Sequence, residues 1–361
     1  MNHFRLNRVN VAEFGFEARH VMANYDIAYS EYTDALGNPV AGSIMNQQIG
    51  ANKLGVFLNL ASDLGPYLSS TLGFRADYFS YNRNLDLSPR GSLTLRLDER
   101  NSVTFSAGIY RQALPLVLLA QDGSNKNLRD LTAIHYMLGF ERLLTESTRL
   151  GIDVYEKDYR DFPVDPQQPS LFLIDELYYR YGFFFNHGDL NGSGKARSRG
   201  VELILQKKMA TDFYGIVSAS YSSSQYMGDG GSWINRVYDN RIIFCIEGGY
   251  RPDDEWEFSL RWIYAGGIPY TPFDAAASRN IDRGVLDANR VNADRYPAYH
   301  SLNARFDKRF NFSGSDMVFY LSVWNVYNRK NVAQYFWNEV KNEQGTIYQP
   351  VGNTSGVRSR V

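Results

Sequence analysis

The 361-residue chain contains one cysteine, Cys245, so it can form neither an internal disulfide framework nor a cysteine-based metal cluster. Acidic and basic residues number 39 and 38, and the formal net charge of -1 provides no basic field for nucleic acid. Long apolar runs are also missing. One of the longest, 242–246, has five residues, whereas a membrane helix needs about 18. If the chain crosses a membrane, it therefore crosses with strands.

Recognisable catalytic and metal-binding patterns are missing as well. The five histidines show no metal-ligand spacing, and we expect each to lie in a loop or in the wall of a sheet. They are His3, His20, His135, His187 and His300. The segment Gly192–Lys195 lacks the first glycine of a phosphate loop and precedes a predicted strand. No pattern brings a nucleophile and a base together, so we predict no enzyme, catalytic residue, cofactor or metal.

Aromatic residues and alternation are what the chain has in abundance. It contains 26 Tyr, 22 Phe and 5 Trp. Apolar and polar residues alternate over segments such as 68–78, 103–110, 150–155, 256–264 and 301–307. This period of two is typical of half-buried strands, and none of these segments repeats near the helical 3.6. The sequence therefore predicts an all-β protein.

Thirteen strands follow from this pattern, with a weak last strand in 344–361. They are 9–19, 52–63, 67–79, 88–98, 102–112, 132–143, 147–158, 197–209, 212–225, 240–251, 255–266, 297–309 and 316–327.

The connections between these strands fall into two classes that alternate strictly. Short turns are expected at 64–66, 98–101, 144–147, 210–211, 252–254 and 311–315. Long loops are expected at about 20–51, 80–87, 113–131, 159–196, 226–239, 267–296 and 328–343. Short turns at one end and long loops at the other are typical of outer-membrane barrels. We therefore predict a transmembrane antiparallel up-and-down β-barrel, closed because lipid tolerates no unpaired strand edge.

The predicted strands match a bilayer in length and polarity. From Trp256 to Tyr264 a tilted strand projects to about 20 Å, close to the ~25 Å apolar band of such barrels. We expect these two rings in opposite aromatic girdles. The alternating charged residues should line a polar lumen, where some would contact a plug. They are Arg75, Asp77, Arg96, Asp153, Glu202, Arg305 and Asp307.

The long loops are rich in Gly, Asn and Asp, and loops on a rigid scaffold commonly carry binding sites. His187 and Asp189 are candidates to touch a ligand. The segment beginning at Asp122 lacks the closing Glu of a calcium loop, and we expect a turn there. The ligand-binding residues stay otherwise unassigned.

Five short segments, in order over about 300 residues, resemble strand and loop motifs of TonB-dependent receptors, particularly those of Bacteroidota. They are 196–203 (ARSRGVEL), 239–241 (DNR), 264–272 (YAGGIPYTP), 302–310 (LNARFDKRF) and 323–328 (VWNVYN). The resemblance implies an outer-membrane receptor of a Gram-negative bacterium for active uptake of a siderophore, another metal chelate, cobalamin or an oligosaccharide. It also implies that a plug domain connects the barrel to TonB, ExbB and ExbD.

Such receptors are expected to have a signal peptide, a plug, 22 strands and a terminal aromatic residue. This chain shows 13 or 14 predicted strands, no apolar segment at Met1–Arg5 and the ending Ser359-Arg360-Val361. We therefore expect residues 1–361 to be a single, partial barrel region that aggregates when expressed alone. A complete 14-stranded passive channel is the first alternative. An outer-membrane enzyme or adhesin is the second.

Overall fold

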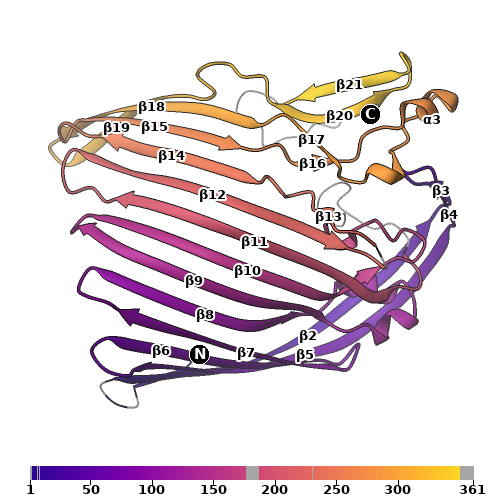
Figure 1. Cartoon of the computed structure of the whole chain (residues 1–361), viewed down its shortest axis with the longest axis horizontal. Coiled ribbons are helices and arrows are strands. Elements are labelled where there is room, and N and C mark those ends of the chain that lie inside the picture. The colour runs from indigo at the N-terminus through magenta and orange to yellow at the C-terminus, as the bar shows by residue number, and fades with distance from the viewer. Residues whose placement is uncertain (1, 6, 8, 176–186, 230, 350–361) are drawn as a thin grey trace.

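A computed structural model describes residues 2–5, 7, 9–175, 187–229 and 231–349. One antiparallel sheet dominates it, and each strand of its wall pairs with the next wall strand along the chain (Figure 1). The wall comprises β1 Asn2–Arg5, β2 Asn10–Tyr29, β5 Ser43–Asp63, β6 Leu68–Phe79, β7 Asn84–Arg96, β8 Asn101–Gln112, β9 Leu131–Thr145, β10 Thr148–Val164, β11 Asn191–Lys207, β12 Phe213–Met227, β14 Ile242–Tyr250, β15 Trp256–Ala265, β18 Tyr299–Phe312 and β19 Ser315–Val323.

Smaller elements occupy the long connections, at the end of the wall opposite the short turns (Figure 1). The strands are β3 Tyr32–Thr33, β4 Pro39–Val40, β13 Ile234–Asn235, β16 Pro269–Tyr270, β17 Asp294–Arg295, β20 Val332–Asn338 and β21 Glu343–Tyr348. The helices are α1 Leu116–Ala120, η1 Ser124–Asn127, α3 Ala275–Asn280 and η2 Ala288–Arg290. No helix of the described residues is long and apolar enough to cross a membrane.

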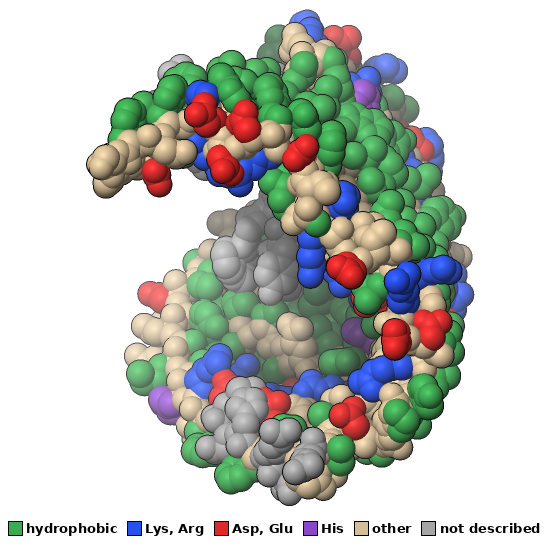
Figure 2. Space-filling view, turned by 90° about the vertical axis from the view of Figure 1, so that its left-hand side faces the viewer, with side chains coloured by type: hydrophobic (Ala, Val, Ile, Leu, Met, Phe, Trp, Pro, Cys, Tyr) green, Lys and Arg blue, Asp and Glu red, His purple; other side chains and the backbone are tan. Residues whose placement is uncertain are grey.

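All thirteen strands predicted from alternation are present in the wall, and the all-β, up-and-down architecture is confirmed. The structure adds β1 ahead of the first predicted strand. Within the described residues β1 pairs only with β2, and β19 only with β18. The sheet accordingly curls around a hollow that is open along one side (Figure 2).

Three predicted connections are wrong. The expected loop 20–51 is mostly strand, because β2 runs to Tyr29 and β5 begins at Ser43. The expected long loop 80–87 is a four-residue turn before Asn84. The expected long loop 328–343 contains β20 and the start of β21, which pair in a hairpin separate from the wall. The weak last strand expected in 344–361 overlaps β21, and residues 350–361 lie outside the described residues.

The two faces of the wall differ in polarity (Figure 2). Outward positions carry apolar side chains such as Leu54, Val56 and Leu58, which are 50%, 54% and 51% exposed. Inward positions carry charges that pair along and across strands, as Arg75 does with Asp77 at 2.6 Å. Water or protein on the inside and lipid on the outside account for this arrangement.

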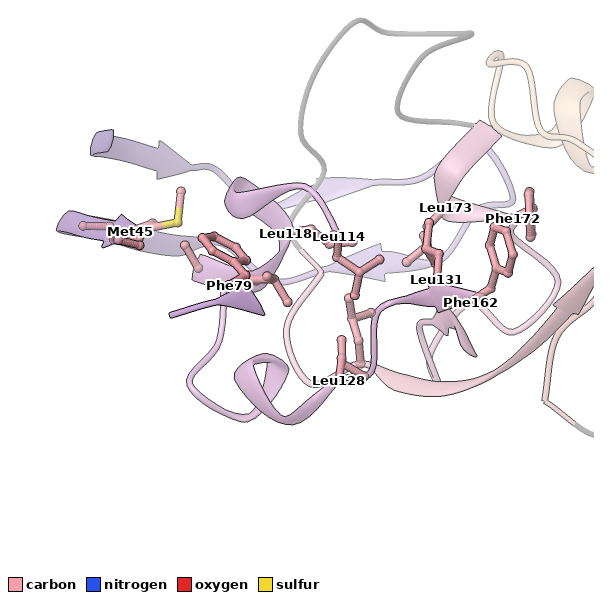
Figure 3. Packing of buried hydrophobic residues seen from close by; sticks show 14 of the residues in the cluster. Met45, Phe79, Leu114, Leu118, Leu128, Leu131, Phe162, Phe172 and Leu173 are labelled. Carbon is pink, nitrogen blue, oxygen red and sulfur yellow. The ribbon is translucent and has the colours of Figure 1, made fainter. Parts of the chain in front are cut away.

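The outer ends of the first two long strands have the opposite polarity. Inward-facing Tyr25, Ile27, Met45 and Ile49 belong to or pack against an apolar core between the loops, shown in Figure 3. Leu118 of α1 is fully buried in this core, since its relative exposure is 0%. The long loops are thus a folded layer with its own hydrophobic centre.

Candidate ligand-binding site

A cavity of about 930 Å³ lies among the long connections. Its walls come from the β2–β5 tip, the segment after β10, the β15–β18 connection and β20. Aromatic side chains dominate the lining: Tyr32, Tyr226, Tyr270, Phe273, Tyr296, Tyr335 and Trp337. A concave, mostly apolar cavity with a few placed polar groups is the usual form of a small-molecule site.

Three tyrosines form the centre of this lining. Tyr270 of β16 lies 4.5 Å from Tyr296, which follows the paired strand β17. Tyr335 of β20 stacks on Tyr296 with centroids 5.0 Å apart and contacts Tyr270 edge-on at 5.1 Å. These separations suit attractive aromatic packing. The triad therefore joins the β16–β17 ladder to the β20–β21 hairpin.

A second aromatic pair lies farther along the same hairpin. Phe273 and Trp337 have centroids 5.6 Å apart. The Trp337 indole N–H donates to Asn342 Oδ1 at 3.2 Å, and the Asn342 amide donates to Asp282 at 2.7 Å. The indole is therefore held at its polar edge while its ring lines the cavity.

The tip of the first hairpin closes one side of the cavity. Leu286 N–H donates to the Ala35 carbonyl at 2.7 Å, and Arg283 Nη2 donates to the Thr33 carbonyl at 2.8 Å. These bonds join segments about 250 residues apart. Figure 1 shows β3 and β4 beside α3, where the two segments meet.

A buried carboxylate anchors the base of the β15–β18 connection. Asp239, with a fully buried side chain, accepts from Arg241 Nε at 2.8 Å and Arg295 Nη2 at 2.5 Å. It also accepts from the Ser224 backbone N–H at 2.9 Å. Two cations and a backbone donor compensate the cost of burying the charge. The network ties β17 to β12 and the turn before β14.

Burial around the cavity raises the pKa values of two of its tyrosines. Burial, followed by the nearby carboxylates of Asp34 and Asp165, raises the pKa of Tyr32 to about 12. Burial first, and then Asp294 and the neighbouring tyrosines, raises the pKa of Tyr270. The raised pKa values of both tyrosines thus follow from their burial beside carboxylates.

The residues singled out from the sequence lie elsewhere. His187 is buried, and its Nδ1 lies 2.8 Å from Asp165. Asp189 accepts from the hydroxyl of Ser124, whose hydroxyl and N–H also interact with Asp122 in a turn. The turn at Asp122 is thus confirmed, whereas His187 and Asp189 hold loops together and do not line the cavity.

The predicted lumen charges lie on inward-facing positions. Arg305 pairs with Asp307 at 2.6 Å, and Arg96 lies 3.7 Å from Asp63. Asp153 and Glu202 occupy paired inward positions of β10 and β11. Contact of these charges with a plug stays a prediction.

The cavity is not predicted by the sequence patterns, although two features of the sequence belong to it. The first is the segment 264–272, which resembles a family motif and contains Tyr270. The second signal is the aromatic run Tyr335–Trp337 inside an expected long loop. Three adjacent aromatics in a connection outside the wall are an unusual composition for a solvated loop.

A profile of the family "TonB dependent receptor-like, beta-barrel" matches residues 2–328. No curated protein matches the chain significantly. Several solved structures share the fold at low sequence identity. The ferric-catecholate import receptor Fiu of Escherichia coli K12 has a TM-score of 0.62 at 12% identity, over 92% of this chain and 50% of that one.

Two further structures show the same relationship. The ferripyoverdine receptor of Pseudomonas aeruginosa, bound to ferripyoverdine, has a TM-score of 0.64 at 15% identity, over 97% of this chain and 46% of that one. The ferric citrate transporter FecA, unliganded, has a TM-score of 0.62 at 12% identity, over 96% and 51%. The chain spans about half the length of these proteins.

Proposed function

The chain belongs to the TonB-dependent receptor-like β-barrel family, and from this premise we propose that it forms the barrel of a receptor for active uptake of a scarce ligand. The family places it in the outer membrane of a Gram-negative bacterium, where its apolar outward face meets lipid. Residues 1–361 would act as one barrel region, with Bacteroidota as the proposed origin. The proposal includes no catalytic step, cofactor or nucleic acid.

The observation that carries this proposal is the aromatic cavity among the long connections. It lies at the end of the wall opposite the short turns, where a ligand arriving from outside meets the protein first. Solved proteins of the same fold are named for ferric catecholate, ferripyoverdine and ferric citrate. A metal chelate is accordingly one class of ligand to test here, alongside cobalamin and oligosaccharides.

The proposed energy source is the inner membrane, reached through TonB, ExbB and ExbD. In this scheme a plug inside the barrel binds TonB and rearranges to admit the ligand. The inward ion pairs, such as Arg305–Asp307 and Arg309–Glu257 at 2.6 and 2.8 Å, provide a polar surface for such a plug. Outer-membrane lipid is the other proposed partner.

Uptake by cells with and without the gene tests the proposal. The probes are labelled ferric citrate, a ferric tris-catecholate, cyanocobalamin and maltoheptaose. We expect uptake of at least one probe to require the protein and to stop when TonB is deleted or a protonophore is added. Gene-dependent uptake that survives both treatments would establish a passive channel and overturn the proposal.

A further inference from the structure

The cavity presents little charge to a ligand. Among the lining residues that the structure describes, only Asp34, Arg283 and Glu339 are charged. The Asp34 carboxylate accepts from the backbone N–H groups of Leu36 and Asn38 at 2.9 and 2.7 Å, within its own turn. The guanidinium of Arg283 donates to the Thr33 carbonyl. The described part of the lining thus offers no cluster of cations of the kind that an anionic chelate requires.

A cationic ligand also fits this cavity poorly, because its two carboxylates are either occupied or exposed to water. Aromatic rings can attract a cation over their faces, and a nearby carboxylate would strengthen that attraction. The Asp34 carboxylate is occupied by its own turn, which also includes the Asn38 amide at 3.1 Å. Glu339 is exposed, so water screens its charge. The fixed charges of the cavity therefore select neither sign strongly.

Aromatic faces and side-chain amides remain as the recognition groups. Tyr296, Tyr335 and Trp337 line the cavity with partly buried rings. The side-chain amides of buried Gln168 and exposed Gln334 also line it, whereas the Asn292 amide donates to the Asn235 carbonyl at 2.9 Å. Aromatic faces carry partial negative charge and attract the weakly positive C–H groups on a sugar ring. Amides both donate and accept, which matches hydroxyl groups.

We propose that this cavity binds a neutral oligosaccharide, and that its tyrosine triad and Trp337 are the stacking surface. The proposal rests on the uptake function proposed above and assigns the substrate class to it. The volume of about 930 Å³ lies at the upper end of the range for ligand cavities, as several linked sugar rings require.

Binding measured calorimetrically on the protein purified from outer membranes in detergent tests the assignment. The probes are maltoheptaose, xylohexaose, laminarihexaose, a ferric tris-catecholate and spermine. We expect saturable binding of at least one oligosaccharide, unchanged between about 50 mM and 500 mM salt because no ion pair forms. Binding of the catecholate or of spermine, with no oligosaccharide bound, overturns the proposal, and so does binding of no probe.

Variants locate the binding and separate stacking from folding. Y335A should weaken oligosaccharide binding about tenfold, whereas Y335F keeps the ring and should retain it. Y348A is the matched control, since Tyr348 lies in the same hairpin, is 51% exposed and does not line the cavity. Q334R adds a cation at an exposed lining position and should strengthen catecholate binding alone. Equal weakening by Y335A and Y348A contradicts the assigned site.

The outcomes separate this inference from the proposed function. TonB-dependent uptake of a ferric chelate without oligosaccharide binding leaves the receptor function intact and removes the substrate class. Oligosaccharide binding together with uptake that does not require TonB supports the cavity assignment and contradicts active transport.

Discussion

The inner half of the β2–β5 hairpin and its outer half follow the same alternation with opposite polarity. In the inner half, outward Phe16 and Val56 are apolar and 81% and 54% exposed, while inward Glu17 carries charge. In the outer half, apolar Tyr25 and Met45 face inward, and polar Asn24, Asp26, Asn46 and Gln48 lie at outward positions, which also include the exposed apolar side chains of Met22 and Ile44. Period two determines which residues share a face, and the surroundings determine which face is apolar.

The same reversal occurs in the β10–β11 hairpin. Outward Val154 pairs with Val201 near the middle of the wall. One pair farther out on the same face, Glu156 accepts from Arg199 at 2.6 Å. An outward ion pair beside an outward valine pair indicates that the outer boundary of the lipid lies between them. Above that boundary the loops have to bury apolar surface against one another.

The largest expected effect is a cavity in the loop core. Leu119 is 0% exposed, so L119A removes packed atoms that neighbours cannot replace, and we expect a loss of about 2–5 kcal/mol. Leu72, 60% exposed on the lipid side, is the matched control, because acyl chains can fill the space left by L72A. Hydrogen exchange of residues 113–130 reports the local opening free energy. Equal effects of the two variants would contradict a separately packed loop layer.

The second effect concerns the lipid face of the wall. V56R places a charge near the middle of the β5 lipid face, and we expect a destabilisation of about 2–4 kcal/mol. S92R introduces the same side chain on an inward position of β7, where the polar interior solvates it, and should cost little. Folding free energies measured in lipid vesicles compare the two. A larger destabilisation by S92R than by V56R would contradict this assignment and place lipid on the inward face of the sheet.

Much of the wall could be predicted from the sequence because apolar and polar residues alternate in many of its strands, such as β6, β8 and β15. The alternation of apolar and polar residues with a period of two predicts the strands at 67–79 and 255–266. The prediction of a loop at 20–51 was wrong because the outer ends of β2 and β5 lack a continuous apolar outward face. Outward positions near the strand ends include polar Asn24, Asp26, Asn46 and Gln48, so the segment resembles a solvated loop when a continuous apolar outward face is expected.

The cavity could not be predicted in the same way, because it depends on contacts between distant segments. Nothing near Thr33 in the sequence indicates that its carbonyl accepts from Arg283. The tyrosine triad likewise combines Tyr270, Tyr296 and Tyr335 from three separate strands or strand ends. Composition could indicate only that the loops are aromatic.

The smallest expected effect is an acid-sensitive contact in the loop layer. Burial alone would raise the pKa of Asp165, but hydrogen bonds from His187 and the Gln167 N–H outweigh it and lower the pKa below its usual value. A lowered folded-state pKa contributes stability that is present above the unfolded value of about 3.9 and is lost as pH falls through the folded value. The layer should therefore loosen below about pH 4, while the wall stays intact.

Replacement of Asp165 separates this contact from general acid unfolding. D165N should lower the local opening free energy of residues 165–175 by about 1–2 kcal/mol at pH 7 and reduce its acid dependence. D122N is the control, because hydrogen bonds to Ser124 also lower the pKa of Asp122, yet its carboxylate lies in an exposed turn where solvent screens it. Hydrogen exchange across pH distinguishes them. If the opening free energy of residues 165–175 depends on acid as strongly in D165N as in the unaltered protein, the Asp165–His187 contact is not its source.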